Sequence, residues 1–138
     1  MTESNQHEIE IWSKDILSGL NQIQNTINTL TLDQAQYEKY LLSTAKKNAS
    51  YPNGVYVGME NQEFFDPSGW EPPSDYVVKD RDWFKDGLNN DHFVFGAVYL
   101  DAQTNSYILS ASTKLNDKDG VKRVASCDVS LENISKMI

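Results

Sequence analysis

Apolar residues recur at spacings of three and four through the first thirty residues, and the positions between them are mainly Ser, Asn, Gln, Lys and Glu. Because an α-helix repeats about every 3.6 residues, this spacing puts one apolar stripe on a polar helix. It predicts a long N-terminal helix with a stripe of Ile9, Trp12, Ile16, Leu20, Ile23, Ile27 and Leu30. The stripe either packs on the sheet of its own domain or also pairs with a copy of itself as a weak homodimer, and the pattern leaves both interpretations open.

A second helix is predicted to start after Asp33. Asp33 and Gln36 have the spacing of a capping box, and apolar and aromatic residues follow at 37–42. We expect this helix to end near Asn48, because Pro, Asn and Gly at 52–54 form a turn signal.

From Gly54 onward the hydrophobic period changes to two, which is typical of a β-strand. Val55 and Val57 are then predicted to face one side of a sheet and Tyr56 the other. A second short strand is predicted over 63–65.

Residues 66–82 contain three prolines, one glycine and several aspartates, and they predict an irregular segment. A loop of this length inside a small domain is usually functional or disordered. Trp70 and Tyr76 argue against disorder, since disordered segments are poor in aromatic residues. A short helix is predicted to follow at about 82–89.

The last third of the chain is predicted to form a three-stranded meander, because short turn-rich connections make consecutive strands antiparallel neighbours. A closing helix is expected from about Leu131. Helices followed by strands predict an α+β domain with helices on one face of an antiparallel sheet. The strands are expected at about 93–101, 106–113 and 121–129, with turns at 102–105 and 116–120.

The composition narrows the function classes. The chain has 138 residues, which fits a single domain, and a net charge of -8, which argues against binding to nucleic acid or to anionic lipid. Its single cysteine, Cys127, excludes an internal disulfide and is expected to be a small buried residue. The sequence contains no motif of the common catalytic, cofactor-binding or metal-binding types. We therefore predict no enzyme activity, no cofactor and no metal site.

Two carboxylates are predicted to lie at one end of the meander. Asp101 ends its first strand and Asp128 ends its third, and Tyr99 shares a face with Asp101. An acidic and aromatic rim of this kind suits an ammonium group. These facts alone favour a simpler interpretation, in which Asp101 is a turn residue and Asp128 caps the last helix.

Arg81 and Trp83 end the long irregular segment. A guanidinium can hold a carboxylate through two parallel hydrogen bonds, and an indole N–H can donate one more. The simpler interpretation is an ion pair of Arg81 with Asp80 or Asp82 and a Trp83 packed in the core.

These same segments resemble the double Cache sensor domains. Residues 69–76 followed by Arg81-Asp82-Trp83-Phe84 are similar to the family's loop. Tyr99-Leu100-Asp101 and residues 127–131 are similar to its later Y-x-D and D-I-S-L segments. Such domains form the extracytoplasmic parts of bacterial chemoreceptors, sensor histidine kinases and diguanylate cyclases. The resemblance implies a long N-terminal helix packed on a PAS-like antiparallel sheet.

The resemblance implies a single Cache module over residues 1–138. Its parts would be the long N-terminal helix at 7–31, the ligand-binding lobe at 33–130 and the start of a truncated C-terminal segment at 131–138. The chain would then be a piece of a membrane-anchored receptor, on the extracytoplasmic (periplasmic or cell-surface) side.

One branch of the family binds amino acids, and its dispersed motif fits here with its spacing. The resemblance implies that Arg81 and Trp83, with Tyr76 nearby, hold the ligand carboxylate. The residues expected around the ligand ammonium are Tyr56, Tyr99, Asp101 and Asp128. Phe84 departs from the motif, because the family usually has a tyrosine there that also contacts the carboxylate. Lys79 departs as well, since it replaces the second arginine of the loop pattern.

The sequence thus predicts a sensor that clamps a free amino acid by its carboxylate and ammonium groups. An amine receptor is the alternative within the binding class, and it would not need Arg81. A ligand-free structural or dimerisation module is the alternative from a different class.

Overall fold

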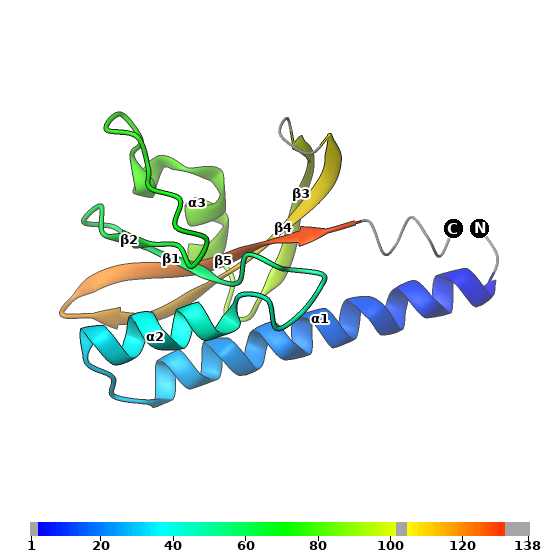
Figure 1. The fold of residues 1–138 in the computed structure, drawn as a ribbon, viewed down its shortest axis with the longest axis horizontal. Helices are drawn as coiled ribbons and strands as arrows, with labels where there is room; N and C mark the ends of the chain where they lie inside the picture. Colours follow the sequence, from blue (N-terminus) through cyan, green and yellow to red (C-terminus); the bar gives the residue numbers. More distant parts are fainter. Residues whose placement is uncertain (1–2, 102–104, 132–138) are drawn as a thin grey trace.

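The computed structural model describes residues 3–101 and 105–131. Helix α1 (Glu3–Thr29) is the long helix that the spacing predicted, and it runs along one face of the sheet (Figure 1). The stripe faces the core, where four of its members are buried: Trp12, Ile16, Leu20 and Ile27. The stripe therefore packs against the core of its own domain, and pairing of α1 with a second copy stays a prediction.

A buried glutamine in the middle of α1 fixes the helix on the sheet. The Gln24 Nε2 atom lies 2.9 Å from the Thr113 hydroxyl and 3.1 Å from the Lys114 carbonyl oxygen, both on the facing strand. It also lies 2.8 Å from the carbonyl oxygen of Asp91. A buried amide without such partners would cost free energy, so these contacts fix where α1 sits along the sheet.

Helix α2 (Gln34–Thr44) begins as the capping box predicted. The Asp33 carboxylate accepts from the Gln36 backbone N–H at 2.8 Å, and the Gln36 side chain accepts from the Asp33 N–H at 3.1 Å. The predicted end near Asn48 is wrong. The Thr44 hydroxyl accepts the backbone N–H of Val55 at 2.9 Å, and the chain turns into an extended conformation directly after Thr44.

The described strands form one antiparallel sheet in the order β2-β1-β5-β4-β3. The predicted meander of the last three strands is confirmed. The pairing of β1 with β5 had no signal in the sequence, because it joins residues 64 to 70 positions apart, from Met59–Arg123 to Tyr56–Ser126. The strands are β1 (Tyr56–Met59), β2 (Phe64–Phe65), β3 (Val94–Asp101), β4 (Ser106–Lys118) and β5 (Val121–Ser130).

Strand β4 is longer than predicted. It continues to Lys118 through an irregularity after Leu115, and the turn is confined to Asp119 and Gly120. Both turn residues have positive φ, of 53° and 77°, as the tight hairpin turn that suits twisted strands requires. The predicted turn at 116–120 was too wide, since the polar residues at its start belong to the strand.

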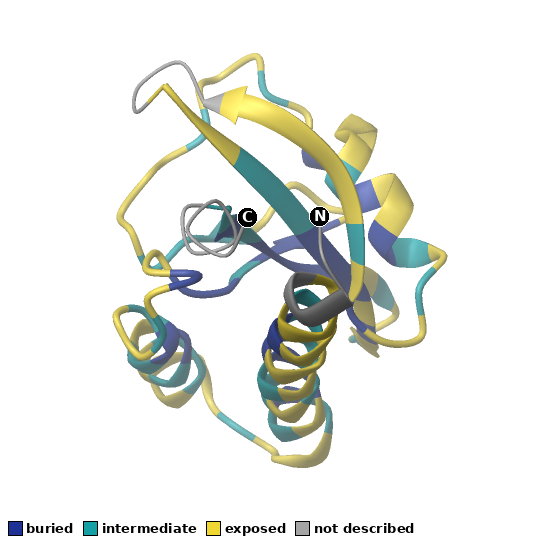
Figure 2. Cartoon of the chain, turned by 90° about the vertical axis from the view of Figure 1, so that its right-hand side faces the viewer, coloured by how far each residue is buried: buried dark blue, intermediate teal, exposed yellow. Residues whose placement is uncertain are grey.

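The two faces of the sheet are covered differently (Figures 1 and 2). Helices α1 and α2 cover one face and enclose the main core. The other face carries α3 (Asp82–Leu88), the 3-10 helix η1 (Val78–Asp80) and the long irregular segment before them. The prediction of helices on one face only is therefore incomplete, and the second face is left partly open beside α3.

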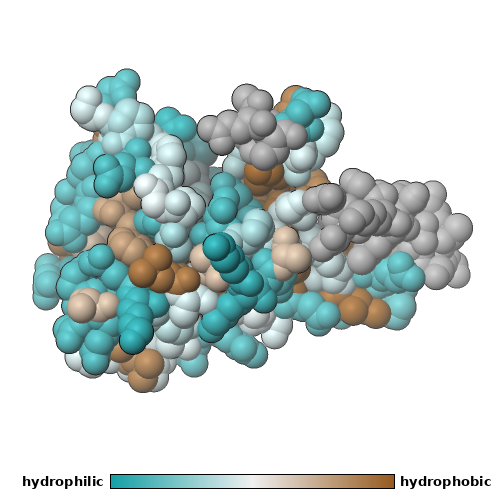
Figure 3. All heavy atoms as spheres, viewed as in Figure 1, coloured by the Kyte–Doolittle hydropathy of each residue, from teal (hydrophilic) through white to brown (hydrophobic). Residues whose placement is uncertain are grey.

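Most of the surface in Figure 3 is hydrophilic, and hydrophobic side chains show in several places, among them the β3–β4 hairpin. The exposed apolar residues of that hairpin include Val98, Leu100 and Tyr107. In residues 3–101 and 105–131, no helix has the length and apolar composition needed to cross a membrane.

Candidate functional site

A cavity of about 800 Å³ lies on the sheet face opposite α1 and α2. Its size falls in the range of small-molecule pockets, which is about 300–1,000 Å³. Every strand of the described sheet and the segment before α3 contribute to its wall. The lining residues are Pro52, Asn53, Tyr56, Phe64, Asp66, Ser68, Trp70, Tyr76, Arg81, Trp83, Tyr99, Ser106, Ile108, Asp128 and Ser130.

The strand register explains why three predicted site residues meet in this cavity. Paired residues of an antiparallel ladder face the same side, and facing alternates along each strand. Tyr99 pairs with Ile108 of β4, Asp128 pairs with Ser110, and the Tyr56 position connects through β5 to Ser112. These three partners, Ile108, Ser110 and Ser112, are alternate residues of β4 and therefore face the same side of the sheet. Tyr56, Tyr99 and Asp128 consequently share one face. This is the alternation that the sequence predicted for Tyr56.

Aromatic rings form the wall between β1 and the long irregular segment. The Tyr56 and Trp83 rings meet edge to face with centroids 5.0 Å apart, and the Trp70 and Tyr76 rings do so at 5.3 Å. Phe64 contacts each of these four rings, with centroids 5.6–6.4 Å apart. Such pairs stabilise one another beyond their area of contact. The cluster therefore holds the irregular segment in place over the sheet.

Two further contacts position this wall. The Gln62 side chain donates to the Tyr76 carbonyl and accepts from the Val78 backbone N–H. Gly58 lets the Trp83 ring lie directly on β1, because a Cβ there would be 2.6 Å from the Trp83 ring and 2.7 Å from Val78. The glycine that follows Val57 in the sequence is thus needed for a close approach of two elements.

The cationic part of the cavity is formed by Arg81, at the N-terminus of α3. Its guanidinium carbon lies 4.8 Å from the centre of the Tyr76 ring, and the Tyr76 hydroxyl accepts the Trp83 indole N–H at 2.9 Å. Neither Asp80 nor Asp82 is within ion-pair distance of Arg81, nor is any other carboxylate of the described chain. The simpler interpretation of Arg81 as a local ion pair is therefore wrong, and the guanidinium has its carboxylate-binding edge available.

The anionic part is formed by Asp128, half-buried on β5 next to Tyr56. Burial raises the pKa of the Tyr56 hydroxyl well above its usual value, and the Asp128 carboxylate raises it further. The phenol therefore stays neutral at physiological pH and keeps its proton. A neutral hydroxyl beside a carboxylate can bind an ammonium group together with it.

Asp101 is the last residue of β3 and pairs with Ser106. Its side chain lies outside what the structure describes, so its expected contact with the ligand ammonium stays a prediction. The predicted closing helix from Leu131 also lies outside the described residues.

Phe84 does not reach the cavity. Only 1% of its surface is exposed, and it packs with Val78 and Val124 in a small core under α3. The expectation that this position faces the ligand carboxylate is not met in this structure. The reason is helical geometry: Trp83 and Phe84 are adjacent on α3, so they point in different directions, and Trp83 occupies the cavity side.

We expect Phe84→Tyr to destabilise the fold by about 1–3 kcal/mol, because its hydroxyl would enter an apolar cluster. We also expect no gain in ligand affinity. Urea unfolding measures the first effect and calorimetric titration the second. Phe65→Tyr is the matched control, since Phe65 is only partly buried. A tyrosine variant at position 84 of unchanged stability and tighter binding would contradict this placement.

Sequence reasoning missed several lining residues. Phe64 belongs to a strand of only two residues, too short to show an alternation, although it contacts four of the site's rings. Asp66 and Ser68 line the cavity from a turn in which Asp66 accepts the Ser68 N–H at 2.8 Å. The sequence Asp-Pro-Ser-Gly indicates a turn, but it does not indicate which face of the sheet that turn lies on.

In the part of the chain that the structure describes, no group of three or more His, Cys, Asp or Glu side chains is arranged to hold a metal ion. Cys127 is fully buried on the opposite face of the sheet, where burial raises the pKa of its thiol well above the usual value.

Fold and site together define a PAS-like sensor lobe, with a long helix on one face of the sheet and a ligand-sized cavity on the other. Residues 21–136 match the family described as the methyl-accepting chemotaxis protein-like, first PDC sensor domain. The chain belongs to this family, and the resemblance to Cache-type sensors is confirmed.

The curated relatives are chemotaxis receptors. The chain is 26% identical over 145 residues to the methyl-accepting chemotaxis protein McpC of Bacillus subtilis. It is 25% identical over 83 residues, or 60% of the chain, to the methyl-accepting chemotaxis protein PscA of Pseudomonas syringae. The chain spans 22% of the length of McpC and 13% of the length of PscA, so it corresponds to a small part of each relative.

Solved chemoreceptor domains share the fold. The ligand-binding domain of the Pseudomonas aeruginosa amino-acid chemoreceptor PctC, in complex with GABA, matches with a TM-score of 0.79 and 21% identity. That match covers 96% of this chain and 59% of the PctC domain. The Campylobacter jejuni chemoreceptor Tlp3 with 4-methylisoleucine matches with a TM-score of 0.77 and 18% identity, over 99% of this chain and 58% of that one. At these identities the likeness establishes the fold.

Proposed function

We propose that this chain is the ligand-binding sensor lobe of a bacterial transmembrane chemoreceptor, and that its cavity binds a free amino acid. One observation carries the proposal: a single cavity contains an arginine with no carboxylate partner among the described residues and, across an aromatic wall, a half-buried aspartate beside a neutral tyrosine. This arrangement complements a zwitterion, because it offers opposite charges to its two ends.

Roles for the lining residues follow from this arrangement. Arg81 receives the ligand carboxylate, with the Tyr76 hydroxyl and the Trp83 indole beside it. Asp128 and the Tyr56 hydroxyl receive the ammonium group. For Tyr99 and Asp101 we keep the role that the family resemblance implies, which is to complete the ammonium end.

Related solved domains support the choice of ligand class. PctC was solved with GABA, Tlp3 with 4-methylisoleucine and with L-valine, and the Pseudomonas fluorescens chemoreceptor CtaA with L-isoleucine. Each of these ligands has one amino and one carboxylate group, as the cavity requires. We further propose that the lobe lies on the extracytoplasmic side of a membrane-anchored parent protein and acts by binding alone, without catalysis.

The fold suggests how binding could reach the rest of a receptor. Strand β5 presents Asp128 to the cavity, while its neighbours Cys127 and Val129 pack on the other face in the core that contains α1. Strand β4 holds Gln24 of α1 through Thr113. A ligand that draws the strands and the segment before α3 together would therefore shift the surface on which α1 rests.

A thermal-shift screen tests the proposed ligand class. At a hundredfold excess over Kd, a ligand of the native state stabilises it by about 2.7 kcal/mol, which moves the Tm of a domain this size by several degrees. We expect at least one free L-amino acid to raise the Tm, and its carboxamide and decarboxylated analogues to have little effect.

Equal stabilisation by the matching amine would favour the amine receptor over the amino-acid receptor. No shift with any of the twenty amino acids or common amines would favour a structural module. Screening Arg81→Ala in parallel separates specific binding from a general effect of each compound on stability.

A further inference from the structure

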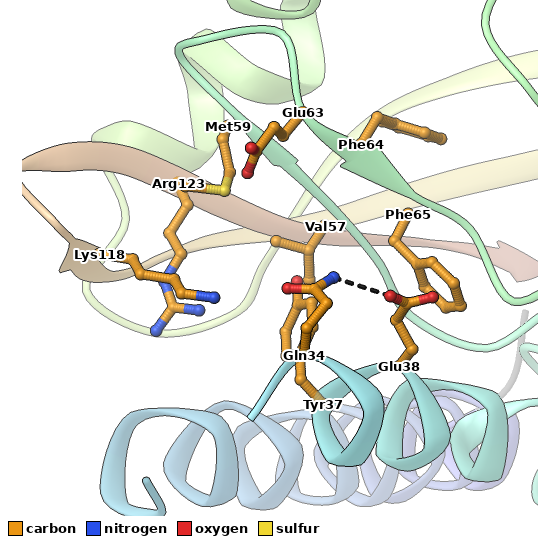
Figure 4. Close-up of a pocket in the computed structure, with 10 residues that line it drawn as sticks. All are labelled: Gln34, Tyr37, Glu38, Val57, Met59, Glu63, Phe64, Phe65, Lys118 and Arg123. Carbon is orange, nitrogen blue, oxygen red and sulfur yellow. Dashed lines mark hydrogen bonds between the residues drawn. The ribbon is translucent and has the colours of Figure 1, made fainter. Parts of the chain in front are cut away.

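A second cavity, of about 350 Å³, lies on the other face of the sheet, between α2, strands β1 and β2, and the end of the β4–β5 hairpin (Figure 4). Met59 pairs with Arg123 of β5 and Val57 with Phe65 of β2, so these side chains share the face that α2 covers. The residues that line this second cavity are Gln34, Tyr37, Glu38, Val57, Met59, Glu63, Phe64, Phe65, Lys118 and Arg123.

Arg123 is the unusual group in this cavity. Its side chain is buried, with 9% of its surface exposed, and its Nε donates to the Asn116 carbonyl oxygen at 2.6 Å. Among residues 3–101 and 105–131, no carboxylate lies within ion-pair distance of the guanidinium. A buried charge is normally paired, because removing it from water is costly. Arg123 thus places a buried positive charge, with no ion-pair partner among the described residues, at the wall of a cavity.

The Asp117 carboxylate acts on this charge from beyond ion-pair distance, and the other neighbours of Arg123 do not neutralise it. The Tyr37 hydroxyl lies beside the guanidinium, and burial raises the pKa of Tyr37 to about 12, so the phenol is uncharged at physiological pH. The Lys118 ammonium lies 5.6 Å from the centre of the Tyr37 ring and adds a second positive charge. Figure 4 shows Arg123 and Lys118 reaching the same side of the cavity. This side offers two cations and a hydroxyl donor to an anion.

The rest of the cavity restricts which anion fits. Val57, Met59 and Phe65 provide an apolar surface next to the cations. Glu38, held by Gln34 at 2.8 Å, lies across the cavity from the two cations in Figure 4, and Glu63 lines the wall beside Met59. A second negative charge on the ligand would meet these carboxylates.

We propose that this second cavity binds a small monocarboxylate with an apolar body. Its carboxylate would lie against Arg123 in the bidentate geometry that a guanidinium favours, within reach of Lys118 and the Tyr37 hydroxyl. Its apolar body would cover Val57, Met59 and Phe65. This site lies on the opposite face of the sheet from the amino-acid cavity, and among the described residues Phe64 alone lines both.

Butyrate is the probe for this site, followed by the methyl resonance of Met59 and by calorimetric titration. We expect saturable binding that shifts the Met59 methyl, and much weaker binding of inorganic phosphate and of the uncharged butyramide. Lys118→Gln should weaken butyrate binding by about three- to tenfold, since it removes one charge-assisted contact. Lys122→Gln is the matched control: Lys122 is exposed on the same hairpin, and the net charge changes equally.

Arg123→Gln should abolish butyrate binding, and Lys118→Gln keeps the test valid if that variant does not fold. Arg81→Ala should leave butyrate binding unchanged, which separates this site from the amino-acid cavity. A butyrate effect that is lost in Arg81→Ala, or equally reduced in Lys122→Gln, would overturn the proposal. No movement of the Met59 methyl would also overturn it, and Arg123 would then serve only to tie α2 to the sheet.

Discussion

Asp128→Asn is expected to weaken amino-acid binding by roughly 30-fold to several thousandfold, equivalent to about 2–5 kcal/mol. Asparagine keeps the shape of the side chain but removes the negative charge that faces the ligand ammonium. The loss is large because Asp128 is half-buried beside Tyr56, where water compensates poorly for a missing partner. Calorimetric titration with the amino acid found in the thermal-shift screen measures the effect.

Asp80→Asn is the control for this experiment. Asp80 is exposed in η1 and changes the net charge by the same amount, so its Kd should stay within about twofold of wild type. A similar loss in both variants would mean that the overall negative charge attracts the ligand. An unchanged Kd in Asp128→Asn would remove this residue from the site and leave Tyr56 without its proposed role.

The elements that sequence reasoning predicted well are those with a local cause. The stripe from Trp12 to Ile27 and the capping box at Asp33 are both short-range patterns, and both appear in the structure as predicted. The end of α2 depends instead on a hydrogen bond between Thr44 and Val55, two residues on different elements. Such contacts leave no periodic signal, so boundaries of this kind could not be read from the pattern.

The sheet shows the same division at a larger scale. Short turns predicted the β3–β4–β5 meander, but nothing local indicated that β5 also pairs with β1. That pairing places Tyr56 next to Asp128 and so creates the end of the cavity that we propose holds the ligand ammonium. From the residues alone, Asp128 was better explained as a helix cap, and only the family resemblance assigned it to a site.

Phe84 shows where carrying over a motif by spacing reaches its limit. Position 84 falls at the spacing of the motif's tyrosine, yet the phenylalanine found there packs under α3 against Val124. A phenylalanine satisfies that apolar environment without any polar partner, which a tyrosine would need. The departure from the motif is therefore consistent with the local packing of this chain. The proposed carboxylate end of the cavity rests on Arg81, Tyr76 and Trp83 and does not need Phe84.

Arg81→Ala is expected to weaken binding of the amino acid by about 2–5 kcal/mol and to leave binding of its decarboxylated analogue nearly unchanged. The reason is that Arg81 is the cation of the cavity wall, and the analogue has no carboxylate to contact it. Both ligands are titrated into the wild type and the variant, which gives four binding free energies. The difference between the loss for the amino acid and the loss for its analogue isolates the carboxylate contact. Lys85→Ala is the control, because Lys85 is an exposed cation one turn further along α3.

The cycle also detects an indirect role of Arg81. Its guanidinium lies over the Tyr76 ring, and Tyr76 in turn accepts the Trp83 indole N–H, so the substitution could loosen the aromatic wall. A loosened wall would weaken both ligands alike, because both pack against the same rings. Equal losses would therefore make Arg81 a positioning residue and assign the carboxylate end to the Tyr76 hydroxyl, which accepts the Trp83 indole N–H and can donate its own proton. A loss confined to the amino acid would place the carboxylate on Arg81 itself, since only that contact differs between the two ligands.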